Sequence, residues 1–165
     1  MIHGIFAADR LGGLGFKGTL PWPHNKEDLH NFQELTSGHV VVMGRKTWED
    51  PKMPKPLPNR INYVITNRPI LTPGVRTLHG DIIANLRNIE QIHSNKDIFV
   101  IGGKEIIETA SILFNKLYLT HINSTYRSDT RIHLDKFLLS FRAISARPSE
   151  SRSCTFMVYK NLFQA

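Results

Sequence analysis

The sequence predicts an α/β fold: a mostly parallel sheet of about eight strands with an antiparallel C-terminal end, and about four helices flanking its two faces. Two observations carry this prediction. Over the first two thirds of the chain, short β-branched and apolar runs alternate with stretches of helical pattern, which favours parallel crossovers. The last two strand-like runs have no helical stretch between them, which favours antiparallel pairing.

The elements follow from local patterns along the chain. Gly44, Gly80 and the Gly102-Gly103 pair mark turns from strands into helices. Residues 50–59 contain four prolines and cannot form a regular element, and residues 11–18 contain four glycines, which is typical of a mobile loop. We expect helices at 25–36, 45–49, 81–92 and 104–110, and strands at 2–8, 39–43, 61–66, 75–78, 97–101, 116–122, 141–145 and 155–159.

Length and composition are those of an ordinary globular protein. At 165 residues, with 41% hydrophobic and 21% charged residues, residues 1–165 are expected to form one domain. No apolar run is long enough to span a membrane, and the N-terminus lacks a signal-peptide pattern, so we expect a soluble, cytoplasmic protein, and a monomer. The lone Cys154 excludes an internal disulfide, and no His-x-x-x-His pair supports a metal site.

The net charge of +7 and the pI near 9.8 raise the question of a polyanionic partner. The lysines and arginines are scattered, and no tract of five or more basic residues occurs. A small polyanionic ligand fits this pattern at least as well as DNA or RNA. We therefore expect no nucleic-acid partner.

The first predicted helix carries an unusual carboxylate. Asn25 is a good N-cap, and Asp28 falls at the third helical position. Asp28, Phe32 and Leu35 share one helical face, with Leu29 close by, so one acid lies on the side expected to face inward. Asp28 could simply serve its own helix as a first-turn carboxylate. Because acids are almost never fully buried without a partner, a functional role is the alternative.

Two strand-to-helix turns are candidate anion sites. One is Met43-Gly44-Arg45-Lys46-Thr47 and the other is Ile101-Gly102-Gly103-Lys104. Free backbone N–H groups, the positive end of the helix dipole and a missing Cβ favour anions at such turns. Together they suggest one extended ligand with several phosphates. Neither turn matches the Gly-x-Gly-x-x-Gly or P-loop pattern, which disfavours an ordinary Rossmann or NTPase site.

An ordered set of motifs resembles dihydrofolate reductase from residue 2 to about residue 130. The set comprises Pro21-Trp22 with Asp28 and Phe32, Val42 to Glu49, Pro56 to Arg60, Val100 to Gly103, and Leu117 to Ile122. The resemblance implies that family's fold and its reaction, in which NADPH reduces 7,8-dihydrofolate to tetrahydrofolate for one-carbon and thymidylate metabolism. It also implies antifolate inhibitors as partners.

The resemblance assigns roles on the substrate side. Asp28 matches the acid that binds the pterin, where a carboxylate can accept two adjacent N–H groups. Thr120 matches the hydroxyl that supports this acid, and Arg60 matches the clamp on the glutamate carboxylate. The catalytic set implied is Asp28, Trp22, Leu20 and Thr120, and the substrate-binding set is Ile5, Ala7, Asp28, Phe32, Leu57, Arg60, Ile101 and Thr120.

The resemblance also assigns the NADPH-binding residues. Residues 44–47 match the segment that holds phosphates, residues 66–68 match the wall around the 2′-phosphate, and Gly102-Gly103 match a pair joined by a cis peptide. Residues 11–20 match a loop that closes over the reacting rings. The set implied is Ala7, Leu14, Gly15, Gly44, Arg45, Lys46, Thr47, Thr66, Asn67, Arg68, Ile101, Gly102, Gly103, Lys104, Glu105 and Ile106.

The sequence departs from the family pattern at four places. Ile107 stands where a tyrosine is usual near the nicotinamide, and Ser128 to His133 keeps only Asp129 of its loop pattern. Asp50 to Lys55 runs about two residues long, and one extra residue separates Trp22 from Asp28. These departures bear on loop motion and inhibitor fit more than on the reaction.

Three other interpretations compete with this one. A related reductase acting on a pyrimidine intermediate of riboflavin synthesis would have no reason to keep Trp22, Asp28 and Arg60 together. A nucleic-acid-binding module should interleave aromatic and basic residues on one face, which the sequence does not show. A catalytically silent protein of the same fold is the third alternative.

Overall fold

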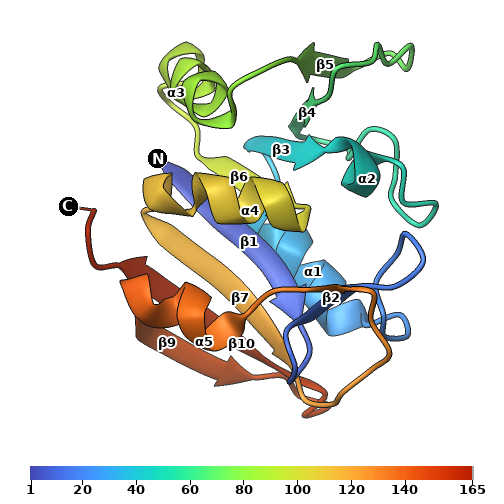
Figure 1. The fold of residues 1–165 in the computed structure, drawn as a ribbon, viewed down its shortest axis with the longest axis vertical. Helices are drawn as coiled ribbons and strands as arrows, with labels where there is room; N and C mark the ends of the chain where they lie inside the picture. The colour runs from blue at the N-terminus through green and yellow to red at the C-terminus, as the bar shows by residue number, and fades with distance from the viewer. Residues whose placement is uncertain (165) are drawn as a thin grey trace.

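The computed structural model describes residues 1–164, and within them one eight-stranded sheet has the order β5-β4-β3-β6-β1-β7-β10-β9 (Figure 1). Strands β1 and β3 to β7 run parallel, and β10 and β9 are antiparallel additions at one edge. Their bounds are β1 Ile2–Ala8, β3 Val40–Gly44, β4 Ile61–Ile65, β5 Val75–Leu78, β6 Ile98–Gly102, β7 Lys116–Ile122, β9 Phe141–Pro148 and β10 Cys154–Asn161. The predicted mixed sheet is confirmed.

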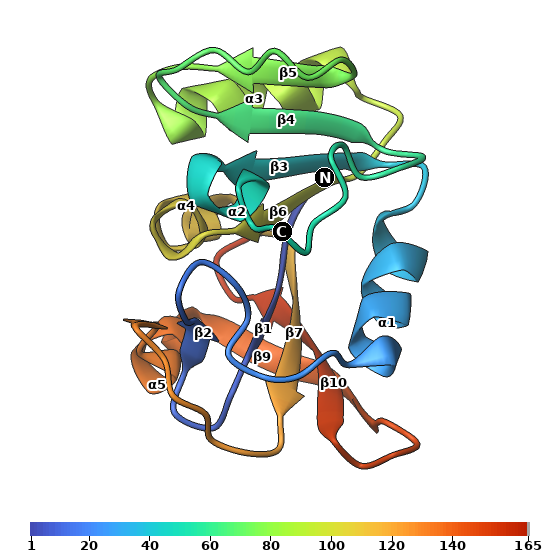
Figure 2. The ribbon, with the colours of Figure 1, turned by 90° about the vertical axis from the view of Figure 1, so that its right-hand side faces the viewer.

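Helices cover both faces of this sheet. Helix α1 lies on one face, and α3 and α4 lie on the other (Figure 2). The described helices are α1 Lys26–Thr36, α2 Arg45–Trp48, α3 Ile82–Ile92, α4 Lys104–Ala110 and α5 Leu134–Phe137, with short 3₁₀ turns at Ser111–Leu113 and Leu138–Ser140. The first four were predicted. The short α5 was not, because four residues are too few to show a helical period.

The central strands are apolar throughout because helices cover both of their faces. Val40 to Met43 of β3 have no exposed surface, and Ile98 and Val100 of β6 are equally buried. One side of the sheet packs with α3 and α4 into the larger core, and the other packs with α1, Trp48 and Leu57 into a second core. Phe32 and Leu35 of α1 join this second core, whereas Leu29 is 43% exposed.

The expectation that residues 11–18 form no regular element was wrong in part. Gly13–Gly15 form β2, which pairs antiparallel with β8, Thr130–Arg131. The pairing was invisible in the sequence because its partner lies more than 110 residues away and the strands are very short. Strand β9 also extends to Pro148, three residues beyond the predicted end.

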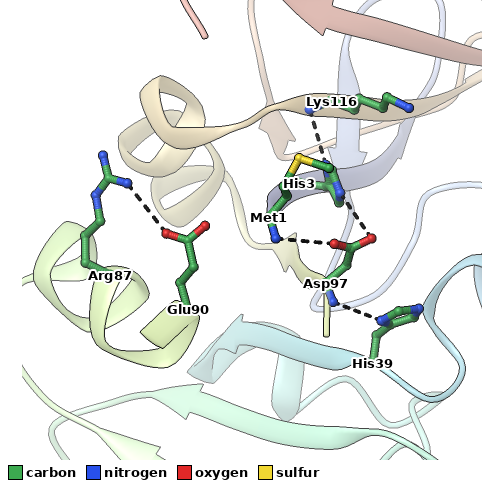
Figure 3. A network of polar contacts seen from close by, with 7 residues as sticks. All are labelled: Met1, His3, His39, Arg87, Glu90, Asp97 and Lys116. Carbon is green, nitrogen blue, oxygen red and sulfur yellow. Dashed lines mark hydrogen bonds and ion pairs between the residues drawn. The ribbon is translucent and has the colours of Figure 1, made fainter. Parts of the chain in front are cut away.

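At the N-terminal ends of the parallel strands, Asp97 binds the N-terminal amine of the chain (Figure 3). Its Oδ1 lies 3.3 Å from the N-terminal amine of Met1, and its Oδ2 lies 3.5 Å from Nε2 of His3. The backbone N–H of Asp97 donates to Nδ1 of His39, and the backbone N–H of Lys116 donates to Nδ1 of His3. These contacts fix the starts of β1, β3, β6 and β7 and leave the other end of the sheet for ligands.

Candidate functional site

Asp28 lies in the first turn of α1, where the helix faces β7. The side chain of Asn25 caps the helix by accepting from the backbone N–H of Asp28 at 3.1 Å. Burial raises the pKa of Asp28, and a hydrogen bond from the hydroxyl of Thr120 acts in the opposite direction. Thr120 is 5% exposed and stands in register with Ala7 on β1. The structure therefore brings together Asp28, Thr120 and Ala7.

An apolar wall continues from this carboxylate along the α1 face of the sheet. Ile5 and Leu57 are buried in the second core, and Phe32 and Ile101 pack against it. These four residues come from β1, the 50–59 loop, α1 and β6. The sequence predicted five apolar substrate residues, and the structure places these four in one cluster, whereas the fifth, Ala7, packs against the cluster that contains Trp22.

Trp22 is nearly buried, at 5% exposure, and packs into a small cluster with Ile122, Cys154 and Phe156. Tyr126 joins the cluster with its ring centroid 6.5 Å from that of Trp22. Trp22 is thus fixed by packing two residues after Leu20, which is 40% exposed. Trp22 is therefore a packed aromatic side chain, whereas Leu20 close to it in the sequence is an exposed loop residue.

Arg60 closes the substrate side at the far end of the apolar wall. Its Nη1 donates to Thr36 Oγ1 at 3.0 Å, and its Nε donates to the carbonyl of Pro58 at 2.8 Å. Its guanidinium carbon lies 5.7 Å from the ring centroid of Phe32. Burial lowers the pKa of Arg60, and no carboxylate of residues 1–164 forms an ion pair with it. The guanidinium is oriented by neutral groups and its charge remains available.

The two glycine turns lie side by side, because β3 and β6 are neighbours with Met43 opposite Gly102. A Cβ on Gly44 would lie 2.7 Å from Cδ1 of Ile106, so a larger residue there would require the Ile106 side chain to move. Gly102 has φ +137°, which favours glycine, and its peptide bond to Gly103 is cis, as the resemblance implied. A Cβ there would lie 3.2 Å from Oγ1 of Thr47 and 4.0 Å from Cδ1 of Ile107. Ile107, the residue that replaces the family's tyrosine, is thus near this turn.

Arg45 joins the first turn to residues 66–69. Its Nη1 donates to Oγ1 of Thr66 at 3.5 Å and to the carbonyl of Arg68 at 3.2 Å. Its buried Nε lies 3.5 Å from Glu49 but has no hydrogen-bond acceptor among the described residues. The remaining predicted polar cofactor residues are exposed around it or along α4: Lys46, Asn67, Arg68, Lys104 and Glu105. The hydrogen bond from the backbone N–H of Lys17 is the main cause that lowers the pKa of Asp129, and the charge of Lys46 makes a small further contribution.

Two acids, Asp9 and Asp129, hold the loop that contains Leu14 and Gly15, and only Asp129 was expected from the sequence to lie at this loop. The side chain of Asp129 accepts from the backbone N–H of Lys17 at 2.8 Å, and its own N–H donates to Gly15. Asp9 is 1% exposed, and its carboxylate accepts from the N–H groups of Leu11, Gly13 and Tyr126 at 2.8 to 2.9 Å. An acid directly after a buried strand was the only sequence signal for Asp9.

The residues at the two turns fit a dinucleotide phosphate ligand. A Cβ at Gly44 would meet Ile106 and one at Gly102 would meet Thr47, so both turns keep a bare backbone, and the buried Nε of Arg45, 3.5 Å from Glu49, forms no hydrogen bond with the described residues. Arg45, Lys46 and Arg68 supply positive charge around the cradle. Within residues 1–164, no group of three or more His, Cys, Asp or Glu side chains could hold a metal ion.

Comparisons with known proteins agree with this geometry. The sequence model of the family "Dihydrofolate reductase" matches residues 1–161. Type 8 dihydrofolate reductase from Escherichia coli is 36% identical over 145 residues, covering 85% of each chain. Dihydrofolate reductase from Bacillus subtilis strain 168 is 35% identical over 130 residues, covering 78% of this chain and 73% of that one.

A solved structure is similar over nearly the whole fold. Dihydrofolate reductase from Enterococcus faecalis, complexed with NADP(H) and RAB-propyl, has a TM-score of 0.82 and 26% identity. The match covers 98% of this chain and 96% of that chain. With the inward carboxylate on α1 and the paired glycine turns, these matches lead to one conclusion: the chain belongs to the dihydrofolate reductase family, whose reaction is the NADPH-dependent reduction of dihydrofolate.

Proposed function

We propose that this chain binds dihydrofolate between α1 and β7 and protonates its N5 while C6 receives the hydride. The observation that carries the proposal is the inward Asp28 against Thr120, on a face otherwise walled by apolar side chains. NADPH supplies the hydride from its nicotinamide C4. The work of the protein is to orient the two rings, exclude water and control one proton.

Asp28 and Arg60 hold opposite ends of the substrate in this proposal. The carboxylate of Asp28 accepts two adjacent N–H groups of the pterin, and charge-assisted bonds of this kind are stronger than neutral ones. Arg60 binds the glutamate carboxylate with a guanidinium that already faces the apolar wall. Phe32, Leu57, Ile5 and Ile101 line the space between these charged ends.

The raised pKa of Asp28 suits a role in proton supply, because a general acid works best when its pKa lies near the working pH. A carboxylate that binds the amino edge of the pterin lies away from N5. Asp28 therefore acts on N5 through water, and the fixed indole of Trp22 borders that water's position. Leu20 lies in the loop that shields the rings from solvent.

On the cofactor side, Gly44, Thr47, Gly102 and Gly103 approach the phosphates with their backbone, and Ile106 packs behind them. Arg45, Thr66, Asn67 and Arg68 surround the 2′-phosphate. Lys46, exposed next to Arg45, adds positive charge at the first turn. Lys104 and Glu105 open α4 at the second turn, beside the nicotinamide-facing residues Ala7 and Ile101.

We further propose that the chain is a single domain and acts as a cytoplasmic monomer on small molecules. One sheet includes all the long described strands, which supports the first point. In residues 1–164, no helix is both long and apolar enough to cross a bilayer.

The test is a spectrophotometric assay of NADPH oxidation with dihydrofolate, and methotrexate binding measured with and without NADPH. We expect turnover that methotrexate blocks, and tighter methotrexate binding when NADPH is present. A pyrimidine substrate of the riboflavin pathway should give no turnover. Turnover of that pyrimidine without turnover of dihydrofolate would refute the proposed function.

A further inference from the structure

Three positively charged residues stand side by side across the strands at one edge of the sheet. Lys116 on β7 is directly opposite Lys160 on β10, and Lys160 is directly opposite Arg142 on β9, the last strand of the sheet (Figure 1). Neighbouring strands lie about 5 Å apart, so the three α-carbons extend over about 10 Å. These three residues form the cation row.

No acid of the described chain balances the cation row. Among residues 1–164, no carboxylate forms an ion pair with Lys116, Lys160 or Arg142. Asp97 lies near the start of β7, but its carboxylate faces the N-terminal amine and His3, and the side chain of Lys116 extends away from it (Figure 3). Like charges directly opposite each other destabilise a sheet. The row therefore lowers the stability of the isolated chain, and an anionic partner would relieve this repulsion.

The cation row lies on the side of the sheet that carries α1. Lys116 stands opposite His3 of β1, and the ring centroid of His3 lies 5.4 Å from that of Phe99 in the second core, the core on the α1 side. Side chains directly opposite each other on adjacent strands point to the same face. Lys160 and Arg142 therefore share this side with Lys116.

A β-bulge brings a fourth cation to the same side. Arg142 and Arg147 are five positions apart, and a regular strand would point them to opposite faces. The register of β9 against β10 skips Ile144, so this extra residue turns both arginines to one side. The guanidinium carbon of Arg147 lies 4.5 Å from the ring centroid of Phe156, and its Nη2 donates to Oδ1 of Asn31 on α1 at 3.4 Å.

The sheet next to the cation row is only partly covered. Tyr118 and Val158, which stand opposite each other on β7 and β10, are half-buried. Val41 and Met43, at the centre of the same side, have no exposed surface. A partly open apolar floor bordered by cations suits a partner that presents apolar and acidic side chains together.

We propose that this face binds an acidic amphipathic helix of a partner protein. Side chains on successive turns of one helical face are about 5–6 Å apart, which is close to the spacing within the cation row. Three acids on successive turns can thus pair with the three cations, while apolar neighbours cover Tyr118 and Val158. The inference does not depend on the proposed function, because the face includes none of the substrate or cofactor residues.

Two other occupants fit this face less well. Antiparallel pairing of β9 with a second copy about the middle of the strand would set Arg142 opposite the second copy's Arg147, and two chains of net charge +7 repel. A single-stranded nucleic acid needs aromatic rings on which its bases can stack. Tyr118 is half-buried, and Phe156 is 7% exposed with Arg147 over its ring.

The probe is a helical peptide of about 20 residues with glutamates on every turn of one face and leucines beside them. A second peptide has the same composition, with its glutamates spread around the helix. Fluorescence anisotropy measures the binding of each labelled peptide to the unaltered protein. We expect the patterned peptide to bind about fivefold or more tightly than the second one, and to bind more weakly at high salt.

Two variants at the centre of the row test which residues bind the peptide. Lys160→Gln should weaken binding of the patterned peptide about two- to fivefold, the scale of an exposed ion pair. Lys160→Glu should weaken it about tenfold or more, because a repulsive charge replaces an attractive one. Thermal unfolding reports folding, and Lys160→Glu should melt higher than the unaltered protein because it gains two opposite-charge neighbours. NADPH-dependent turnover should not change in either variant.

Lys136→Glu is the matched control, since Lys136 is exposed on α5, whose Phe137 packs on the other side of the sheet. It makes the same change of charge and should leave peptide binding unaltered. Equal weakening in this control, or equal binding of the two peptides, would overturn the proposal in favour of general charge attraction. Tighter binding of an oligothymidylate that also depends on Lys160 would overturn it in favour of a nucleic acid. A dimer in sedimentation that Lys160→Glu dissociates would overturn it in favour of a second copy.

Discussion

At the scale of single residues, the site depends on the carboxylate of Asp28, which folding places in a buried position that disfavours its negative charge. Burial raises the pKa of Asp28, which means that the folded chain disfavours its charge. A raised folded pKa makes the ligand-free protein lose stability as pH rises from the unfolded value of 3.8 through the folded value. Asp28 therefore opposes stability at neutral pH and is useful only when a ligand donates to it.

Asp28→Asn separates these two roles. We expect turnover to fall by roughly 10²–10⁴-fold, the range for a lost acid–base group. We also expect the melting temperature of the ligand-free protein at neutral pH to rise, because a disfavoured charge is removed. Steady-state kinetics and thermal unfolding with and without methotrexate measure both effects. Glu34→Asn, at an exposed position of the same helix, is the control and should change neither; unchanged turnover in Asp28→Asn would reject its assigned role.

Arg45 and Lys46 are adjacent in the sequence but point to different surroundings. Arg45 donates to Thr66 and to the carbonyl of Arg68, whereas the exposed side chain of Lys46 forms no hydrogen bond or ion pair with the described residues. We expect Arg45→Ala to narrow the preference for NADPH over NADH by about tenfold or more, the scale of a hydrogen bond to a charged group. Lys46→Ala should weaken both cofactors alike. Binding titrations with NADPH and NADH decide this, and a larger loss of preference in Lys46→Ala would reverse the assignment.

At the scale of elements, the glycine-rich loop is ordered by acids that bind its backbone. Asp9 accepts three backbone N–H groups, two from the loop itself and one from Tyr126 in the segment that leads to β8. Gly13 packs so closely that a Cβ there would lie 2.8 Å from Oδ2 of Asp9. The pairing of β2 with β8 then extends this attachment to Gly15. The loop is rich in glycine, and its backbone is held by hydrogen bonds to the carboxylates of Asp9 and Asp129.

Asp9→Asn tests this attachment. An amide has only one accepting oxygen, so at least one buried N–H group loses its partner. We expect the free energy of unfolding to fall by about 1.5–3 kcal/mol, measured by urea denaturation. We also expect a raised KM for NADPH, because Leu14 and Gly15 lie on the attached loop. Glu108→Gln, an exposed carboxylate on α4, should have neither effect, and a variant as stable as the unaltered protein would show that Asp9 does not order the loop.

At the scale of the whole molecule, three histidines make stability depend on pH. Burial lowers the pKa of His3, His93 and His121 below the ordinary 6.5. Asp97 partly opposes this at His3, while the N-terminus and Lys116 reinforce it. A lowered folded pKa means that the unfolded chain binds protons more readily once pH falls to about 6.5. Acid therefore destabilises the fold through these three groups.

The melting temperature of the ligand-free protein should fall between about pH 7.5 and about pH 5.5, since the histidines begin to titrate in the unfolded chain within this range. His3→Gln should reduce the slope, because glutamine can still meet the N–H of Lys116 but takes up no proton. His30→Gln, at an exposed position on α1, serves as the control. Thermal unfolding across this pH range checks the prediction, and a flat profile or an equal change in both variants would contradict it.

The sequence by itself determined the eight strands of the main sheet, the first four helices, the cap at Asn25 and the inward position of Asp28, because each depends on residues at most a few positions apart. It also determined the family, through motifs kept in order. Only the tertiary structure decided that the Gly44 and Gly102 turns are neighbours, that β2 pairs with β8, and that Asp9 accepts from the backbone N–H of Tyr126. These contacts join residues far apart in the chain, and a local pattern carries no record of which distant backbone or charge will lie beside it.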